Sequence, residues 1–472
     1  MNLKKEDKMA ELQLAEQEIA QSPDSVDQVQ YQVYEQAPAQ YNLQDSLNRL
    51  ARLGGFTFLE SAVDGIAAMN PDRTARKRAF LLDDNRKSAR EELKNRIHLW
   101  IDLLQSDSIT EMLDVSRKKM ETVSKVLSDN QLIAVEAVRE LEKSYRNVML
   151  FYKNTETDKL TNISIVNASS EQVTDLDNSR FIDHVANELR QNYDKLDLRT
   201  NYSLLVIPGY MGSPAVVDKW SKIAYENKAM LYTDFMDLDK PDDVVELFMP
   251  SGLAGGEAFK ANTCMACNWL VGRKKYAELG ETEDLHISPA AALAGKVYGT
   301  LMSQITAGKK HGGINEVENV VFKLKKSEIS QLDTLGLIPM VNEYGKVMAF
   351  SGKTLFNGEN LGLQTYSVVR VFDYIMKVLF DFLNRRAFEN WSGKTERDLR
   401  GEIIKFLDNI QGADRLIEKF KIVRFERDPV SKDRIFLDLF ITPYFPAKSF
   451  VIKMDGTKGE DDTTWNGSVE QQ

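Results

Sequence analysis

Cysteine and histidine are scarce in this sequence. The chain has 2 cysteines and 4 histidines among 472 residues, and so few cysteines cannot build the disulfide framework of a small secreted protein. The charged start of the chain, MNLKKEDKMAEL, also lacks the apolar segment of a secretory signal. We therefore expect a cytoplasmic protein without a disulfide framework.

Long apolar runs and an excess of positive charge are missing as well. Charged side chains interrupt the most apolar long stretch, residues 368–383, and a membrane span of about 20 residues would not tolerate them. Lys and Arg number 61 against 71 Asp and Glu, and the resulting net charge of −10 would repel a phosphate backbone. Neither membrane insertion nor nucleic-acid binding is expected.

The rest of the composition is that of a globular protein. Apolar residues make up 43% and charged residues 28% of the chain, which is enough material for a sizeable core. At about 150 residues per domain, the length suggests about three domains. We predict a multi-domain α/β (mixed α+β) fold, divided into a helix and Gln-rich linker arm over residues 1–60, a helical region over 61–155, an α/β middle domain over 156–310, a β-rich C-terminal domain over 311–455 and a polar acidic tail over 456–472.

Apolar spacing predicts the elements within these regions. Helices over 83–150 carry two apolar stripes, which we interpret as packed faces: Leu93, Ile97, Trp100, Ile101 and Leu104, then Ala134, Val138, Leu141, Tyr145 and Val148. The middle of the chain alternates strands with helices: strands at 162–166, 202–207 and 230–235, and helices at 181–193, 215–225 and from Ser288 to about 303. The last third predicts a strand at 319–324, a helix at 327–335, a hairpin over 337–350, helices at 366–386 and from Thr395 to about 410, paired strands at 421–427 and 434–442, and a last strand at 448–454.

Two stretches show the period-two alternation of a strand with one apolar face. Val29, Tyr31 and Val33 alternate with glutamines in the linker arm. This is either chance in a biased segment or a strand donated to the sheet of another subunit. Near the C-terminus, Ile435, Leu437, Leu439 and Ile441 alternate strictly, while Phe436 and Phe440 add a second apolar face, so that strand needs cover on both sides.

Short motifs of chemical interest are incomplete. The pair Cys264 and Cys267 has redox or zinc spacing, but no histidine lies at ligand spacing, so we expect two buried structural thiols. The sequences at 351–354 and 392–395 resemble the end of a phosphate-binding loop without its earlier glycine, and the loop 252–256 is too irregular for a dinucleotide fingerprint. No catalytic, cofactor-binding or metal-binding residue is predicted.

The turn from Gly209 to Ser213 is the strongest remaining enzyme motif. It follows a predicted strand and resembles the oxyanion turn of α/β-hydrolases, but those enzymes also need a G-x-S-x-G pentapeptide, which the sequence lacks. We interpret it as a strand-to-helix turn, and a hydrolase-like enzyme remains the alternative.

The order of these segments resembles the large subunit of the type VI secretion contractile sheath, most like the branch found in Bacteroidetes, and more remotely the contractile phage tail sheaths. The resemblance covers residues 83–454. Its motifs are Leu141-Glu142-Lys143-Ser144-Tyr145-Arg146 before the first strand, Gly336-Leu337-Ile338-Pro339-Met340, the helix segment 369–375, and a closing strand that ends in Pro443-Tyr444-Phe445. In this sequence Tyr145 stands where the family usually has tryptophan, and the family's Gly-Gly-x-Pro-aromatic segment is not recognisable.

The resemblance implies a structural protein rather than an enzyme. Its implied partners are a small sheath subunit, further copies of the chain in a helical lattice, an inner tube of haemolysin-coregulated protein, a baseplate and a AAA+ unfoldase that recycles the sheath. Residues 311–455 would form the sheath assembly domain with strands shared between subunits, and residues 3–20 would be the handle for the unfoldase. The candidates for shared strands are Val29, Tyr31, Val33, Ile435, Leu437, Leu439 and Ile441, and those for contact with the tube are Arg370, Asp373, Lys377, Asp381 and Arg385. A phage-type tail sheath is the other alternative.

Overall fold

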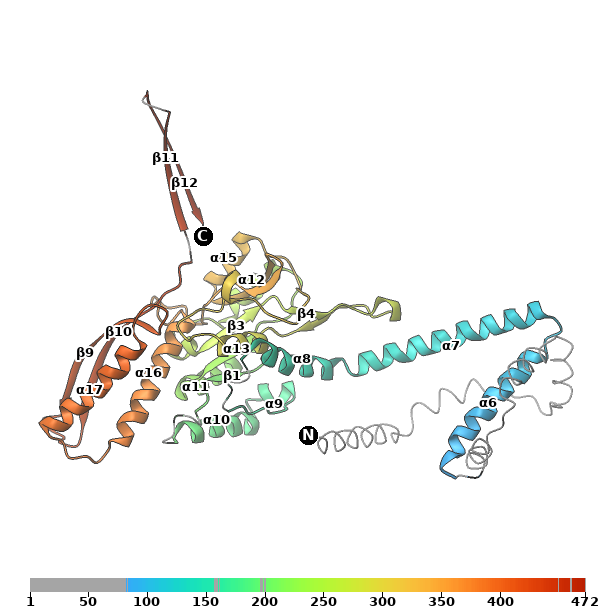
Figure 1. Ribbon diagram of the computed structural model, residues 1–472, viewed down its shortest axis with the longest axis horizontal. Coiled ribbons are helices and arrows are strands. Elements are labelled where there is room, and N and C mark those ends of the chain that lie inside the picture. The colour runs from blue at the N-terminus through green and yellow to red at the C-terminus, as the bar shows by residue number, and fades with distance from the viewer. Residues whose placement is uncertain are drawn as a thin grey trace, which may run out of the picture. The chain divides into compact units, whose positions relative to one another are not determined.

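The computed structural model describes residues 82, 84–156, 160, 162–195, 198, 201–448, 450–458 and 461–471. The chain divides into two compact units, residues 1–130 and 131–472 (Figure 1). The predicted helix at 3–20 and the strand candidates Val29, Tyr31 and Val33 lie outside the described residues. Their roles stay predictions.

The described part of the first unit is helical, as predicted. A 3-10 turn, η1 (Asp84–Arg86), precedes α6 (Lys87–Leu104), and α7 (Ile109–Ala137) continues past the boundary between the units. The turn between the helices is capped, because the Glu111 backbone N–H donates to Ser108 Oγ at 3.1 Å while the Glu111 carboxylate accepts from the Asp107 N–H at 3.0 Å. Lys119 and Asp102 add an ion pair of 3.4 Å.

The packed apolar faces expected for these helices are not found in the described part of the chain. In α6, Leu93, Ile97 and Trp100 are 46%, 48% and 63% exposed, and only Leu104 of the expected stripe is buried. Periodicity correctly predicts the helices, but it does not specify what covers the apolar face. None of the helices described is long and apolar enough to cross a membrane.

A five-stranded sheet organises the second unit. Its order is β1 (Leu204–Val206), β2 (Met230–Asp234), β3 (Thr263–Cys267), β7 (Leu337–Glu343) and β8 (Lys346–Ala349). The first four strands are parallel and β8 pairs antiparallel with β7. The turn of the β7–β8 hairpin has positive φ at Tyr344 and Gly345, the geometry that Gly favours in tight hairpins. Since β7 and β8 follow residue 311, the domain boundary predicted at 310 cuts through one sheet.

Alternate side chains of the strands enter two separate cores, as a sheet covered on both faces requires. Met230, Tyr232 and Ile338 face the first core, and their neighbours Leu231 and Leu337 face the second. The first core contains α8 (Arg139–Asn154), α13 (Ala290–Tyr298) and the start of α16 (Tyr366–Arg385). The second contains α9 (Ser170–Thr174), α10 (Arg180–Tyr193), α11 (Pro214–Glu226), α12 (Pro241–Phe248) and α15 (Lys326–Thr334).

Helices α8 and α13 cross so closely that one position has to be glycine. A Cβ atom added to Gly295 would lie 2.4 Å from the carbonyl oxygen and 3.0 Å from the Cα of Phe151. Both are backbone atoms, so the helices would have to move apart.

We expect Gly295→Ala to destabilise the protein by about 1–3 kcal/mol, because this overpacking outweighs the better helix propensity of alanine. Thermal unfolding measures the loss. The matched control is Gly401→Ala, at a helical position with nothing within 4 Å, which should be neutral or gain up to about 1 kcal/mol. An equal response of the two variants would contradict the close crossing.

Three other strands of the second unit form a smaller antiparallel sheet. It has the order β5 (Leu285–Ile287), β4 (Leu270–Arg273) and β6 (Asn319–Val320). The short helices that connect these parts are η4 (Met249–Ser251), η5 (Ala258–Asn262), η6 (Ala277–Leu279) and α14 (Gly308–His311).

The C-terminal part has a third core. The later turns of α16 and the helix α17 (Gly393–Ile410) pack on a hairpin of β9 (Ile417–Arg427) and β10 (Ile435–Pro443). A second hairpin follows, formed by β11 (Phe450–Lys458) and β12 (Asp461–Gln471).

Several predicted boundaries need correction. Residues 162–166 form no strand, and the predicted strand at 319–324 is reduced to β6. Helix α13 ends at Tyr298 rather than near 303, and α17 begins earlier than predicted because Ser392 accepts the Thr395 N–H as its N-cap. The segment expected to be a polar tail after 456 contains the end of β11 and all of β12. Its alternating residues are too polar to predict a strand from periodicity.

Candidate assembly surfaces

The β9–β10 hairpin holds the C-terminal strand candidates. Leu437 pairs with Phe425 and Ile441 with Phe420, with a bulge between Asp438 and Leu439. The alternating apolar residues of β10 are partly buried and pack on the third core: Ile435, Leu437, Leu439 and Ile441. Because these side chains already contact their own chain, a link to another subunit would use the main chain at the strand edges. Their role in such a link stays a prediction.

The sheet of this hairpin contains only β9 and β10, so among the described residues both outer edges are open except at the start of β9, where Ile417 forms a bridge with Gln411. Edge strands present unpaired N–H and C=O groups that can pair with another chain. The outer face is mixed: Arg424 forms a 3.1 Å ion pair with Asp438 and stacks on Phe436, while Phe440 is 63% exposed. Arg424 therefore covers Phe436, as predicted for the second apolar face of this strand, whereas Phe440 on the same face is not covered.

The first two turns of α8 place charged residues inward and apolar residues outward, whereas Leu150 near the end of the helix lies in the first core. Glu142 and Arg146 form a 2.8 Å ion pair, and Glu142 also contacts Arg273 of β4 at 3.1 Å. Leu141 and Tyr145, in the motif that carries the family resemblance, are 70% and 66% exposed. The packed stripe predicted here is therefore wrong for these residues, and their exposure marks a second candidate contact surface.

The charged stripe predicted on α16 is mostly interior. Arg370 and Lys377 are buried, and the Asp373 side chain is 15% exposed and pairs with Lys228 at 3.9 Å. Only Arg385, at the outer end, is accessible: its side chain is 63% exposed and pairs at 2.9 Å with Asp381, whose side chain is 16% exposed. A regular row of charged residues in a sequence does not show whether that row faces solvent or the interior of the protein.

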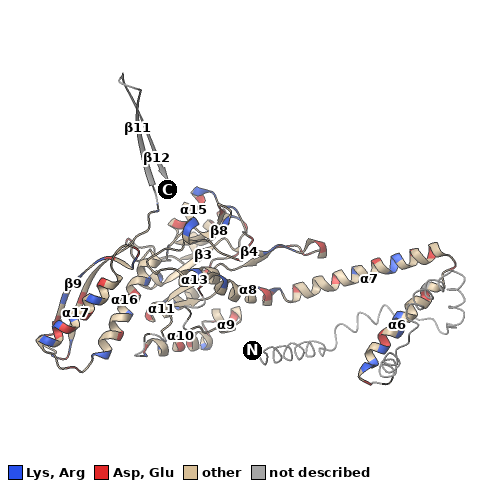
Figure 2. Cartoon of the chain, viewed as in Figure 1, with Lys and Arg blue, Asp and Glu red and all other residues tan. Residues whose placement is uncertain are grey.

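The exposed face of α16 is apolar. Phe372, Met376 and Phe380 repeat every four residues and are 40%, 42% and 59% exposed. Helix α17, by contrast, carries both signs of charge along its length (Figure 2). Sequence reasoning missed the α16 face, because apolar spacing along a helix does not show which of its sides is covered.

Both cysteines of the CxxC pair are buried, as predicted. They lie in β3, and their spacing of three places them on opposite faces of the sheet, Cys264 in the first core and Cys267 in the second. Burial raises the pKa of Cys264 to about 12. Among the described residues, no group of three or more His, Cys, Asp or Glu could hold a metal ion.

The turn 209–213 leads from β1 into α11, as predicted. Gly209 and Gly212 have positive φ, and Ser213 Oγ accepts the Val216 N–H as the N-cap of α11. The Gly209 N–H donates to Asp234 at 2.8 Å, and Asp234 also accepts from Ser288 and from the Ala290 N–H. Burial raises the pKa of Asp234 to about 7. These bonds tie the ends of β1 and β2 to the start of α13.

A histidine–aspartate pair lies at the end of β2 that carries Asp234. His286 Nδ1 is 2.8 Å from Asp237 Oδ2, and this hydrogen bond raises the pKa of His286 above its ordinary value. Because the pKa of His286 is raised in the folded state, protonation of this side chain stabilises the folded protein. The stabilisation is fully present at pH values below the unfolded-state pKa of about 6.5 and is lost as the pH rises through the folded-state pKa.

We expect His286→Gln to lower the thermal midpoint at pH of about 5.5 and to leave it nearly unchanged at about 8.5. The loss should stay below about 1 kcal/mol, because solvent screens this half-exposed pair. Parallel melts at the two pH values measure it. Equal losses at both would show that protonation is not the cause.

Three family models match consecutive regions of the chain. They describe the N-terminal region of TssC/VipB-like proteins over residues 43–131, the central domain of type VI secretion system TssC/VipB over 133–357, and the TssC/VipB-like C-terminal domain over 365–471. Among curated proteins, none matches the chain in sequence.

Solved structures of contractile sheaths show distant likeness. The contracted helical sheath of the anti-feeding prophage has 15% identity over 67% of this chain and 82% of that chain, with a TM-score of 0.46. The contracted PVC sheath complex of an extracellular contractile injection system has 14% identity over 59% and 75%, with a TM-score of 0.43. The sheath tail protein from Desulfitobacterium hafniense has 14% identity over 62% and 59%, with a TM-score of 0.38.

Proposed function

The chain belongs to the TssC/VipB family of type VI secretion sheath proteins, and we propose that it polymerises with a small sheath subunit into a contractile sheath around an inner tube. The observation that carries the proposal is the match of three consecutive family models, which together span residues 43–131, 133–357 and 365–471. The chain is a structural sheath subunit. Its named partners and the absence of enzyme activity are part of the proposal.

The geometry of the C-terminal part supports assembly through shared strands. The β9–β10 hairpin is anchored on α16 and α17 by its inner side chains, while its open edges offer main-chain groups. We assign the donated strand to Val29, Tyr31 and Val33 of a neighbouring copy, because their alternation supplies one apolar and one polar face. Strand pairing of this kind keeps subunits linked while their bodies rotate during contraction.

The remaining partners are assigned to surfaces as follows. Contact with an inner tube of haemolysin-coregulated protein is assigned to Arg385, the accessible member of the charged stripe, together with its ion-pair partner Asp381. Residues 3–20 would serve as the handle of a AAA+ unfoldase after contraction. A baseplate would nucleate the sheath. These assignments, and a cytoplasmic location, follow from the family.

Co-expression tests the proposal most directly. The full chain expressed with the small sheath subunit of the same secretion system is expected to form hollow tubules in negative-stain electron micrographs. Monodisperse heterodimers that persist under polymerising conditions would contradict it. Tubules formed by this chain alone would instead favour a phage-type sheath, which needs no small subunit.

The hydrolase alternative has no support from the geometry of the turn. Ser213 Oγ accepts the Val216 N–H, and the described residues give it no hydrogen bond to a histidine. An esterase activity that Ser213→Ala abolishes would restore that alternative.

A further inference from the structure

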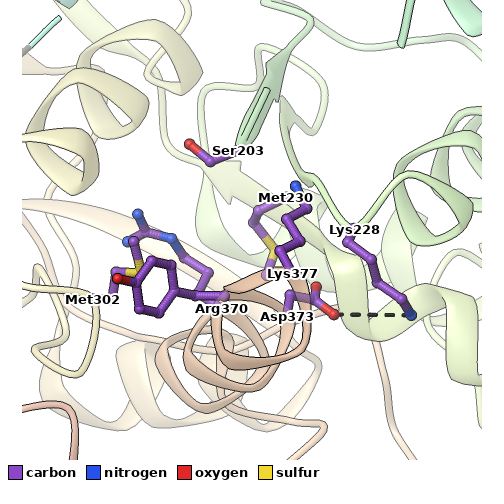
Figure 3. A pocket seen from close by; sticks show the side chains of 8 residues that line it. Ser203, Lys228, Met230, Met302, Arg370, Asp373 and Lys377 are labelled. Carbon is purple, nitrogen blue, oxygen red and sulfur yellow. Dashed lines mark ion pairs between the residues drawn. The ribbon is translucent and has the colours of Figure 1, made fainter. Parts of the chain in front are cut away.

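A small, mostly apolar pocket with charged side chains in its wall lies beneath α16, where the helix crosses the starts of β1 and β2. Its volume is about 50 Å³, and its lining includes Arg370, Asp373 and Lys377 from α16, with Ser203, Lys228 and Met302 opposite. Figure 3 shows Arg370 and Lys377 extending from the helix on the side of Ser203, whereas Asp373 points toward Lys228. Asp373 lines the pocket as well, but its carboxylate is turned toward Lys228 and not toward the two cations.

The charges around this pocket do not cancel. Three cationic side chains face one carboxylate, and Asp373 is already engaged by Lys228 at 3.9 Å and by the Asn262 amide at 2.8 Å. Lys377 donates to the Tyr202 carbonyl at 2.9 Å, and its ammonium lies 5.7 Å from the ring centroid of Tyr193. Neither contact carries a full negative charge.

Arg370 is the least satisfied of these groups. It is only 7% exposed, and the one hydrogen bond given to its guanidinium among the described residues is a 3.4 Å contact from Nη1 to the Val297 carbonyl. No carboxylate of the described chain lies within ion-pair distance of it. Guanidinium has five N–H donors and cannot deprotonate, so a buried one without a counter-charge is strongly unfavourable.

We propose that this pocket binds one small monoanion, a carboxylate-sized group held between Arg370 and Lys377 with the Ser203 hydroxyl as a further donor. An arginine fork matches the two oxygens of a carboxylate. A volume of about 50 Å³ accepts a group of a few non-hydrogen atoms, and the apolar Met230 and Met302 in its wall exclude large hydrated ions. The carboxylate comes either from a free small anion or from an acidic side chain of a neighbouring polypeptide.

Formate serves as the probe in thermal unfolding of the full chain at constant ionic strength. Exchanging a bulky monoanion, 2-(N-morpholino)ethanesulfonate, for formate should raise the unfolding midpoint by on the order of 5 °C once the concentration is about 100 times Kd. Arg370→Gln should abolish the rise. The matched control, Arg385→Gln, changes an exposed arginine of the same helix and should keep it.

A second measurement covers the case in which Arg370→Gln does not fold. The NMR line of chloride should broaden in the presence of the unaltered chain, because chloride would bind in the same pocket. Added formate should displace the chloride and narrow the line again. An unfolding midpoint indifferent to formate, together with chloride lines that formate does not narrow, overturns the proposal.

Repeating the formate titration on assembled tubules identifies the source of the anion. This arm alone rests on the proposed function. A formate effect that persists in tubules assigns the pocket to a free anion. An effect seen in the isolated chain and lost in tubules assigns it to a carboxylate of a neighbouring chain.

Discussion

Replacing Arg273 by methionine is expected to destabilise the central part of the protein by about 3 kcal/mol. The Arg273 guanidinium contacts Glu281 at 2.7 Å and Glu142 at 3.1 Å, and the side chains of Arg273 and Glu281 are 8% and 4% exposed. Breaking a buried ion pair leaves an uncompensated charge, which costs about 3–5 kcal/mol. We expect the lower end, because Glu281 keeps its contact with Arg139 at 2.5 Å.

The measurement is the midpoint of thermal unfolding, which should fall by on the order of 10 °C. Arg385→Met is the matched control, because its ion pair with Asp381 lies at the surface, where such pairs contribute less than about 1 kcal/mol. The double variant Arg273→Met with Glu281→Gln should lose less than the sum of the single losses. Strict additivity would mean that the two side chains do not interact in solution.

This network fixes the orientation of the first turns of α8, and with it the candidate contact surface. Glu142 and Arg146 are held inward, Arg146 also donating to the Gly272 carbonyl at 3.0 Å, so Leu141 and Tyr145 have to face outward. The outward apolar face is therefore a consequence of a buried polar one. An Arg273→Met subunit that still folds should bind its partners less well if this face is a contact surface.

Local patterns sufficed for most of the fold. Short apolar runs over 230–235 and 337–350 predicted β2 and the β7–β8 hairpin, because strands whose two faces enter different cores are apolar along their length. The turn at Tyr344 and Gly345 could be placed from its residues, since positive φ favours glycine. Patterns of this kind involve a few neighbouring residues, so they can be recognised without knowing what packs against them.

The sequence could not show which faces are covered. The stripe of α6 and the row of charges on α16 are both regular, yet Trp100 is exposed and Arg370 is buried. Burial depends on what packs against a helix, and Arg370 is covered by segments more than 70 residues away in the chain, such as Val297. The candidate tube contact was therefore placed on a stripe whose inner half is not accessible.

Replacing Tyr31 by proline is expected to abolish tubule formation by the co-expressed subunits while leaving the isolated subunit folded. Proline cannot donate to a strand ladder, so it is not tolerated in the middle of a paired strand. Tyr31 is the centre of the alternating segment that we assign to a neighbour's open β9–β10 edge. Since that strand would complete another subunit, the loss falls on the lattice and not on the subunit's own unfolding midpoint.

Two control variants separate the main chain from the side chain. Tyr31→Val keeps both the N–H group and a strand-forming apolar side chain, so tubules should form. Gln36→Pro places the same ring in the linker beyond the alternating segment and should also be tolerated. Tubules are counted in electron micrographs, and the thermal unfolding midpoint of the isolated subunits shows whether they are folded. Normal tubules with Tyr31→Pro would exclude the donated strand, whereas a lowered melting midpoint would mean that this segment pairs within its own chain.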